Sequence, residues 1–231
     1  MGISVIIPTL NEAASLPRLL DRLRAGSRDH AVELLVVDGG STDATRQLAA
    51  AAGAVVLEAP RRGRAAQMNY GAARARHELL YFVHADTLPP ESFCTDIRDS
   101  LAAGFPAGCY RFAYDRPPNP LMRLNAYCTR FDRLWCRGGD QSLYLPRTVF
   151  DELGGFCTRH VIMEDFDFIE KIQAKYPFRI LPKDILVSAR KYETNGYLRV
   201  QLANLVVFAM YRLGVSRERM KATYAGMLDY R

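Results

Sequence analysis

Strand-like and helix-like segments alternate through the first hundred residues, with short connections between them. Runs of apolar and β-branched residues predict buried strands at 4–7, 33–37, 54–57 and 79–83. Apolar residues at helical spacing predict helices at 16–23 and 65–75, and another helix is expected after the 38–43 turn, running through residue 52. Pro8 is expected to end the first strand. Strands separated by helices predict βαβ units, and therefore an α/β fold with a mainly parallel central sheet flanked by helices.

This rhythm changes after about Pro106. Strands are expected at 109–114 and 142–145, with a turn over 115–120 between them. Helices are expected near 121–134, 165–175 and 197–213. We therefore expect one domain over residues 1–231, in which 106–231 builds on the same sheet as 1–105 and ends in a helical C-terminal segment.

Composition narrows the class of protein. Hydrophobic residues make up 49% of the 231 residues, enough for a full core, and the net charge of +6 is scattered rather than gathered in a Lys/Arg block. This excludes a typical nucleic-acid binder. The five cysteines form no C-x-x-C pair, which favours reduced thiols in a cytoplasmic protein over a disulfide framework or a zinc site. No secretory signal is visible, and the longest apolar tract, 202–211, is too short to cross a bilayer.

Polar residues follow three of the predicted strands. They are PTLNE at 8–12, DGGSTD at 38–43 and HADT at 84–87. In a parallel α/β sheet, ligands bind beyond the carboxyl ends of the strands, so these segments are expected to meet. No G-x-G-x-x-G or Walker A sequence occurs, which disfavours the common dinucleotide and P-loop sites. An acidic nucleotide site suits a diphosphate if a divalent cation such as Mn²⁺ or Mg²⁺ intervenes.

Each of these features also has a purely structural interpretation. The 38–43 segment can be a simple turn in which Ser41 or Thr42 caps the next helix. Asp86 can cap a helix entry, and His84 can be a satisfied histidine near the core. Acidic residues at 164–165 suit the positive end of a helix dipole. Chance agreement of several such motifs in one order is improbable, so the sequence favours a binding site.

Five motifs taken together carry a family resemblance. PTLNE at 8–12, VDGGSTD at 37–43, GRAAQMN at 63–69, HAD at 84–86 and MED at 163–165 resemble, in this order, the motifs of family 2 glycosyltransferases with the GT-A, Rossmann-like fold. More narrowly, G-R-A-x-Q-M-N, H-A-D-T and G-D-Q resemble a bacterial subgroup associated with arsenosugar biosynthesis.

The resemblance implies a nucleotide-diphosphate sugar as donor, most often UDP-linked. By their matching positions, Pro8, Asn11 and Glu12 are expected to lie against the nucleoside. Asp38 matches the aspartate that hydrogen-bonds the base, and Arg64 matches a position that reaches the base or the phosphates.

The resemblance also implies how the reaction proceeds. HAD matches the family's Asp-x-Asp element, in which the last carboxylate, here Asp86, coordinates Mn²⁺ or Mg²⁺. His84 departs from this pattern, and we expect it behind the metal or near the ribose. Asp165 matches the carboxylate that serves as catalytic base in an inverting displacement. Arg190 lies in SARKY at 188–192, where a basic segment is expected to grip the diphosphate.

The acceptor side is less sharply defined. Asp140, Gln141 and Glu164 are expected to face an acceptor, which is a small molecule or a lipid-linked one. A tight turn is an equal interpretation of Asp140 and Gln141. The helix near 198–213 is typical of a core or homodimer helix, and peripheral contact with a membrane is the alternative. In these terms, 1–105 is the nucleotide-sugar-binding half and 106–231 the acceptor-side half.

Two other functions remain open from the sequence alone. A nucleotidylyltransferase also uses an α/β sheet and a metal, but it needs a Gly-rich loop bearing Lys or Arg where residues 9–12 read TLNE. A catalytically silent nucleotide-sugar-binding protein is compatible with His84 in place of the usual aspartate.

Overall fold

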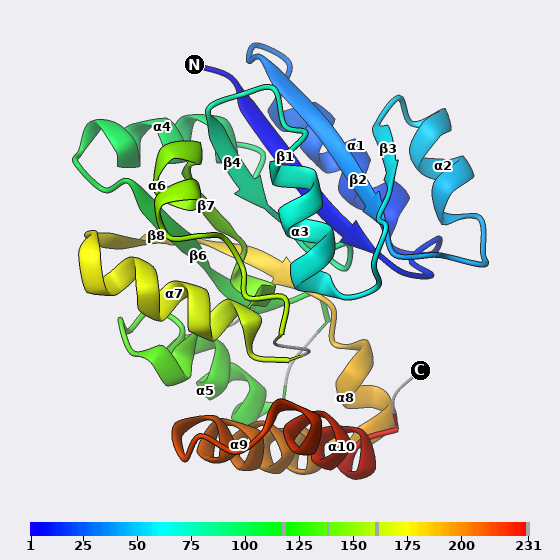
Figure 1. Ribbon diagram of the computed structural model, residues 1–231, viewed down its shortest axis with the longest axis vertical. Coiled ribbons are helices and arrows are strands. Elements are labelled where there is room, and N and C mark those ends of the chain that lie inside the picture. Colours follow the sequence, from blue (N-terminus) through cyan, green and yellow to red (C-terminus); the bar gives the residue numbers. More distant parts are fainter. Residues whose placement is uncertain (117–118, 138, 160–161, 230–231) are drawn as a thin grey trace.

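The fold is built on one eight-stranded sheet in the order β3-β2-β1-β4-β7-β6-β8-β5 (Figure 1). The computed structural model describes residues 1–116, 119–137, 139–159 and 162–229. Within them the strands are β1 (Ile3–Thr9), β2 (Val32–Asp38), β3 (Val55–Glu58), β4 (Leu79–Phe82), β5 (Thr87–Leu88), β6 (Ala107–Tyr114), β7 (Leu143–Pro146) and β8 (Phe178–Val187).

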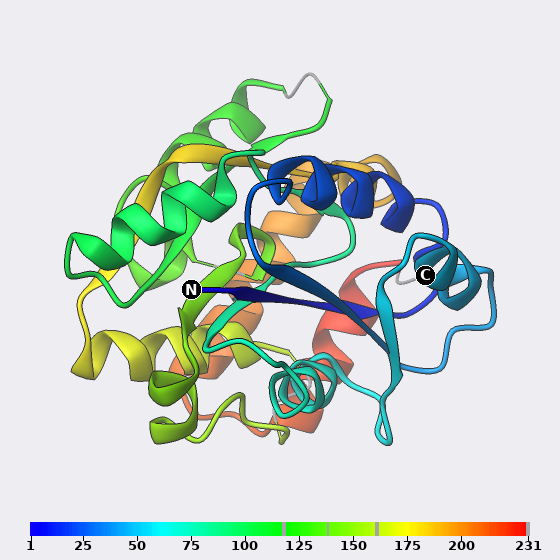
Figure 2. The ribbon, with the colours of Figure 1, turned by 90° about the horizontal axis from the view of Figure 1, so that it is seen from above.

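Helices cover both faces of this sheet. They are α1 (Leu16–Gly26), α2 (Thr45–Ala51), α3 (Arg64–Ala72), α4 (Phe93–Ala102), α5 (Pro120–Cys128), α6 (Arg147–Glu152), α7 (Glu164–Lys175), α8 (Arg190–Asn195), α9 (Tyr197–Arg212) and α10 (Arg217–Met227). Short 3₁₀ turns span Leu134–Cys136 and Gly139–Gln141. Figure 2 shows the blue α1 and green α4 on one side of the sheet, with the cyan α3 and yellow α7 on the other.

The sheet has the mainly parallel character that the sequence predicts. Strands β3, β2, β1 and β4 run parallel, and so do β6 and β8. The exceptions are β7, antiparallel to both β4 and β6, and the short β5, antiparallel to β8. Residues from both halves of the chain therefore belong to one sheet.

The first strand was expected to end at Pro8, but β1 continues through Pro8 to Thr9. The backbone carbonyl of Ile6 accepts a hydrogen bond from the amide of Val83, the residue after β4. Backbone groups two residues apart point to the same side of a strand, so the nitrogen of Pro8 also points toward the β4 side. Pairing with β4 ends at Phe82, so no strand partner there requires the N–H that proline lacks. The helix expected over 121–134 is also shorter, ending at Cys128.

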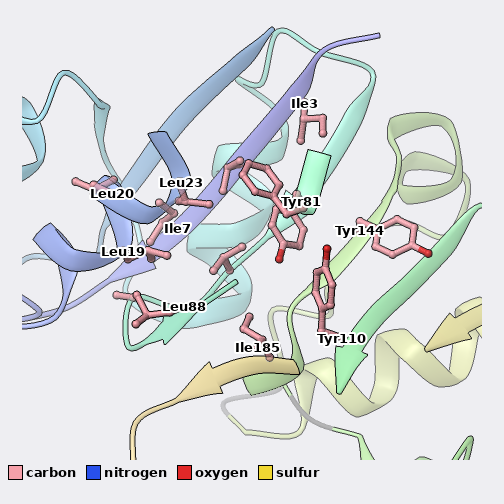
Figure 3. Close-up of a cluster of buried hydrophobic side chains, with 14 of the residues drawn as sticks. Ile3, Ile7, Leu19, Leu20, Leu23, Tyr81, Leu88, Tyr110, Tyr144 and Ile185 are labelled. Atoms are coloured by element: carbon pink, nitrogen blue, oxygen red, sulfur yellow. The ribbon is translucent and has the colours of Figure 1, made fainter. Parts of the chain in front are cut away.

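Two apolar cores lie on opposite faces of the sheet because successive strand residues point to opposite sides. One core joins Ile3 and Ile7 to the leucines of α1 and to Tyr81, which stacks on Phe93 at 5.6 Å (Figure 3). The other joins Ile6 to α3, α6 and α7. All five cysteines are free thiols.

The last three helices form a layer at one end of the molecule, far from β3 (Figure 1). Val200 and Ala203 of α9 pack with Leu228 in a small core of their own. Across the described part of the chain, the structure contains no helix with the length and apolar character needed to span a membrane.

Candidate active site

The loops after β1 and β2 are bound to each other at the carboxyl edge of the sheet. The amide of Asn11 donates to the Ser41 hydroxyl at 2.9 Å, and the Asn11 side-chain oxygen accepts from the amide of Thr42 at 2.8 Å. The amide of Glu12 donates to the Thr45 hydroxyl at 2.8 Å. The two segments that were expected to meet therefore do so, and Asn11 and Glu12 lie beside the second loop.

Asp38 holds the turn after β2. Its carboxylate is 1% exposed and accepts from the amides of Gly40 and Ser41 at 3.0 and 2.8 Å, and from the hydroxyls of Ser41 and Thr9. The contact with a base that we expect for Asp38 stays a prediction; within the chain its oxygens organise the turn. Pro8 is likewise buried, inside β1.

The expected helix cap by Ser41 or Thr42 is wrong. Helix α2 begins at Thr45, and its start is satisfied by Asp43, whose carboxylate accepts from the amide of Thr45 at 3.0 Å and from that of Ala13 at 3.1 Å. Ser41 is instead occupied with Asp38 and Asn11.

Two residues of the GRAAQMN segment have roles that the sequence does not reveal. The buried Gln67 donates from its amide to the carbonyls of Thr9 and Val37, at 2.8 and 2.7 Å, and so joins the ends of β1 and β2. Asn69 exchanges two hydrogen bonds with the backbone of Phe156. No local pattern could have shown these contacts, because the partners are 30 to 87 residues away.

The loop after β4 places His84 and Asp86 at the same edge of the sheet. His84 is 8% exposed, and its Nδ1 lies 3.5 Å from a carboxylate oxygen of Asp140. Burial alone would lower the pKa of His84, but the carboxylates of Asp140 and Asp165 outweigh it and raise the pKa. The imidazole and Asp140 therefore favour the charged pair.

The charges around Asp140 act in the same direction. Partial burial would raise the pKa of the Asp140 carboxyl, but His84, Lys191 and Arg64 bring it to about 2. The side chain is nevertheless 58% exposed, so it is open to a ligand. Lys191 is a cation of the site that sequence reasoning missed, although it adjoins Arg190 in the segment that was expected to hold phosphate.

Asp86 lies among other carboxylates. Burial raises its pKa first, and Asp140 and Glu12 raise it further, while His84 and Arg190 oppose them. The backbone carbonyl of Asp86 accepts from the amide of Ser188 at 3.2 Å, which brings the start of α8 to this loop. Arg190 of α8 lies 3.6 Å from Glu12.

The start of α7 supplies the two neighbouring carboxylates expected there. Glu164 is 0% exposed and pairs with Arg64 at 2.6 Å, so it faces Arg64 rather than an open acceptor space. Burial raises the pKa of Glu164, and Arg64 opposes the rise. Asp165 is half-buried and, with His84, lines a small cavity of about 10 Å³.

Gln141 supports the neighbouring turn instead of facing outward. It is 1% exposed, and its side-chain amide donates to the carbonyl of Tyr110 at 2.9 Å. Of the two interpretations left open for this segment, the structural one describes Gln141, while Asp140 is exposed beside His84.

Backbone strain is concentrated around these residues. The non-glycine residues with positive φ in the described part of the chain are Asn11, Ser142 and Met163, at 56°, 61° and 68°. Asn11 lies in the loop after β1, Ser142 follows Gln141, and Met163 precedes Glu164. Such conformations cost about 1–3 kcal/mol each and gather at functional sites.

The donor set fits a hard cation only if a ligand completes it. Among the described residues, no group of three His, Cys, Asp or Glu side chains could hold a metal. However, Asp86 is crowded by Asp140 and Glu12, and a divalent cation would offset that repulsion. Mg²⁺ and Mn²⁺ commonly take one or two carboxylates and complete their shell with phosphate oxygens and water.

Solved structures match the chain closely in shape. Staphylococcus aureus TarS in complex with UDP superposes with a TM-score of 0.65 at 17% identity, covering 98% of this chain and 70% of that one. Glucosyl-3-phosphoglycerate synthase from Mycobacterium tuberculosis, in complex with Mn²⁺, UDP and glucosyl-3-phosphoglycerate, gives 0.63 at 21% identity, covering 93% and 80%. At these identities the likeness is one of fold, and it confirms the expected GT-A architecture.

The relatives found by sequence include a named glycosyltransferase. The PGL/p-HBAD biosynthesis glycosyltransferase of Mycobacterium bovis is 28% identical over 183 residues, which are 71% of this chain and 67% of the relative. Succinoglycan biosynthesis protein ExoA of Rhizobium meliloti is 31% identical over 108 residues, 43% of this chain. The chain spans only 33% of ExoA and 37% of another curated relative.

The family model described as glycosyl transferase family 2 matches residues 4–164, which is well over half of the 231 residues. The narrower resemblance to arsenosugar enzymes is not tested by these relatives and stays a prediction. The match includes the β1, β2 and β4 loops that meet at the carboxyl edge of the sheet. On this evidence the chain belongs to glycosyl transferase family 2.

Proposed function

We propose that this glycosyltransferase moves a sugar from a UDP-linked donor to an acceptor hydroxyl in a single inverting displacement. The observation that carries the proposal is the meeting of His84, Asp86, Asp140 and Asp165 at the carboxyl edge of the sheet. Support for UDP comes from TarS and glucosyl-3-phosphoglycerate synthase, which share the fold and hold UDP. In this proposal 1–105 holds the donor and 106–231 lines the acceptor side.

Cations at the rim would receive the diphosphate. Arg190 is 55% exposed and paired with Glu12 at 3.6 Å. An exposed pair of this kind contributes only about 0–1 kcal/mol, so its guanidinium can exchange Glu12 for phosphate oxygens at little cost. Lys191 lies near enough to lower the pKa of Asp140 and adds a second positive charge.

Asp86 is the residue we expect to hold Mn²⁺ or Mg²⁺. When bound, the cation neutralises the charge that gathers on the departing diphosphate. His84 is a poorer candidate because its Nδ1 faces Asp140 and its pKa is raised, and a protonated imidazole cannot bind metal. Its place beside Asp140 suits a role in orienting that carboxylate.

Asp165 is the residue we expect to take the proton. It lies in the first turn of α7 and, with His84, lines the small cavity described above. As the acceptor oxygen bonds to the anomeric carbon, the bond from that carbon to UDP breaks and the hydroxyl proton passes to Asp165. No covalent enzyme intermediate is formed, and the anomeric configuration is inverted.

The decisive experiment is a UDP-release assay over a panel of donors and acceptors, with and without Mn²⁺. We expect Asp165→Asn to lose about 10²–10⁴-fold in transfer while UDP still binds, because only the base is lost. Asp86→Ala should lose turnover with the fold intact. The control is Asp167→Asn on the same turn of α7, which removes the charge of a carboxylate that pairs with Lys171 at 2.7 Å.

Other results would redirect the assignment. Near-normal transfer by Asp165→Asn removes it as base, and near-normal turnover by Asp86→Ala removes it as metal ligand. Release of pyrophosphate from a nucleoside triphosphate would favour a nucleotidylyltransferase, and UDP binding without turnover on any acceptor would favour a silent protein. The acceptor panel should contain small molecules, an arsenical and lipid-linked compounds, because the sequence left these open.

The five free thiols support a reducing compartment such as the cytoplasm as the place of the reaction.

A homodimer is the quaternary state that the sequence left open, and light scattering on the purified chain tests it.

A further inference from the structure

Helix α9 carries an unusual apolar stripe on its outer side. Leu198, Leu202 and Leu205 recur at helical spacing and are 72%, 54% and 64% exposed, and Leu213, directly after the end of the helix, is 80% exposed. The core-facing side of the same region is already filled, because Val200 packs against Leu228, and Phe208 contacts the Phe166 ring at 5.8 Å. The stripe is therefore not the side by which α9 attaches to the molecule.

A second apolar segment adjoins it. The hydroxyl of Tyr197, the first residue of α9, donates to the carbonyl of Leu121 on α5 at 3.1 Å. Helix α5 and the turn after it expose Leu121, Leu124, Tyr127, Phe131 and Trp135. Of the thirteen large hydrophobic residues that are exposed in the described part of the chain, nine belong to these two segments. We call residues 119–137 and 197–213 together the α5–α9 surface; both lie at the same end of the molecule (Figure 1).

A groove opens on this surface between β6 and α5. Its volume is about 490 Å³, and its lining includes the apolar Phe112, Leu124 and Tyr127, the basic Arg123 and Arg130, and the acidic Asp184. Asp184 is paired with Arg111 at 3.0 Å, so the unpaired charge contributed by its carboxylate is small. Arg130 lies over the Tyr127 ring at 4.4 Å. Apolar walls with cationic side chains suit an amphiphile that has an acyl chain and an anionic head group.

The net charge of this end of the molecule is positive. Residues 119–137 contain four basic and one acidic residue, and residues 197–229, which span α9 and α10, contain five basic and two acidic residues. The only charged residues of α9 itself are Arg199 and Arg212, near its two ends, where they form exposed pairs with Asp229 and Glu170 at 3.4 and 3.1 Å. Exposed pairs of this kind contribute little, so both arginines can exchange their partners for lipid head groups. Apolar side chains surrounded by arginine and lysine are typical of helices that lie in the interface of an anionic bilayer.

We propose that the α5–α9 surface docks onto an anionic lipid bilayer. Helix α9 has 16 residues and would be about 24 Å long, so it lies in the interface plane and does not cross the bilayer. A second copy of the chain fits this surface less well, because pairing would bring two positively charged surfaces together. The proposal does not depend on the transfer reaction.

Sedimentation of the whole chain with lipid vesicles tests it. We expect the chain to pellet with phosphatidylcholine vesicles containing about 30% phosphatidylglycerol, and much less with phosphatidylcholine alone. Salt that shortens the Debye length to about 3 Å should weaken this binding. The double variant Leu202→Glu with Leu205→Glu should lose at least about tenfold in vesicle affinity, since charges replace two exposed leucines that would enter the bilayer interface.

The matched control is Leu48→Glu with Val55→Glu, which alters two exposed apolar residues on α2 and β3 at the far end of the molecule. It should pellet like the unaltered chain, and UDP binding by both double variants shows that they are folded. The proposal fails if the unaltered chain does not pellet with anionic vesicles, or if the α9 variant pellets equally. It also fails if light scattering shows a dimer that the α9 variant splits, because the occupant is then a second copy.

Discussion

Glu164 and Arg64 form the most deeply buried ion pair of the active site. Glu164 is 0% exposed, and its contact with Arg64 at 2.6 Å is not accompanied by a well-aligned hydrogen bond to either carboxylate oxygen. A carboxylate in such surroundings depends on nearby cations, and Arg64 is the one in direct contact with it. Because Arg64 begins α3 and Glu164 begins α7, the pair also joins two helices and fixes the backbone next to Asp165.

Arg64→Met is therefore expected to destabilise the fold by on the order of 3 kcal/mol, because it leaves a buried carboxylate without its cation. Adding Glu164→Gln to this variant should recover most of the loss, since the remaining group is neutral. Urea denaturation measures both values. Arg62→Met, a change at an exposed arginine two residues earlier, is the control. Equal unfolding midpoints for Arg64→Met and Arg62→Met would show that the pair contributes nothing.

At the level of single residues, the sequence predicted which positions gather but not how each is used. Asp86 follows β4 at the carboxyl edge of the sheet, as the alternation of strands and helices implies. Asp140 and Asp165 join it from the turn before the antiparallel β7 and from the first turn of α7, and strand alternation alone does not imply either position. Gln141 and Glu164 are buried by contacts with Tyr110 and Arg64, which lie far away in sequence. Such pairings follow from tertiary packing, and neither spacing nor residue type reveals them.

Among the elements, α3 packs closely on the sheet, and Gly71 makes this close approach possible. A Cβ atom at Gly71 would lie 2.6 Å from Cγ2 of Ile6 and 2.9 Å from Cγ2 of Val37. Both are buried β-branched residues of the central strands, which have little freedom to move. The position of α3 matters for the site because Arg64 and Gln67 project from it.

Gly71→Ala and Gly226→Ala make a matched pair of helical glycines. Alanine gains about 1 kcal/mol of helix propensity at either position. At Gly226 in α10 a Cβ has nothing within 4 Å, so we expect neutral or increased stability. At Gly71 we expect overpacking of about 1–3 kcal/mol to outweigh the gain, and a net loss. Chemical denaturation of both variants decides it; a Gly71→Ala protein as stable as Gly226→Ala would contradict the close packing.

The elements themselves were predicted well where the pattern is local. The strands β1 to β4 and the helices α1, α7 and α9 lie where apolar periodicity indicates them. The expected end of β1 at Pro8 was wrong because proline's effect depends on whether a neighbouring strand is present at that level. The antiparallel insertion of β7 between β4 and β6 was not predicted, because strand order is set by long-range pairing.

At the scale of the whole molecule, the active site draws on both ends of the chain. The family match ends at residue 164, whereas Asp165, Arg190 and Lys191 follow it. The start of α8 reaches the site through the hydrogen bond from Ser188 to Asp86, and the α5–α9 surface lies beyond it. A donor that contacts both Asp86 and Arg190 would therefore link the β1–β4 region to the C-terminal helices and stabilise the whole fold.

Binding of UDP should raise the melting temperature. Mn²⁺ added together with UDP should raise it further, and by more than Mn²⁺ raises it without UDP, because Asp86 and the diphosphate would share the cation. At a hundred times the dissociation constant, a ligand contributes about 2.7 kcal/mol. For a chain of this size that corresponds to a rise of roughly 5–10 °C. Asp86→Asn should keep the rise with UDP alone but lose the part that requires Mn²⁺. With the unaltered chain and UMP, which lacks the diphosphate, Mn²⁺ should add nothing to the rise in melting temperature. If Asp86→Asn keeps the full Mn²⁺-dependent rise, the cation is held by other residues, and the exposed Asp140 is then the first to test.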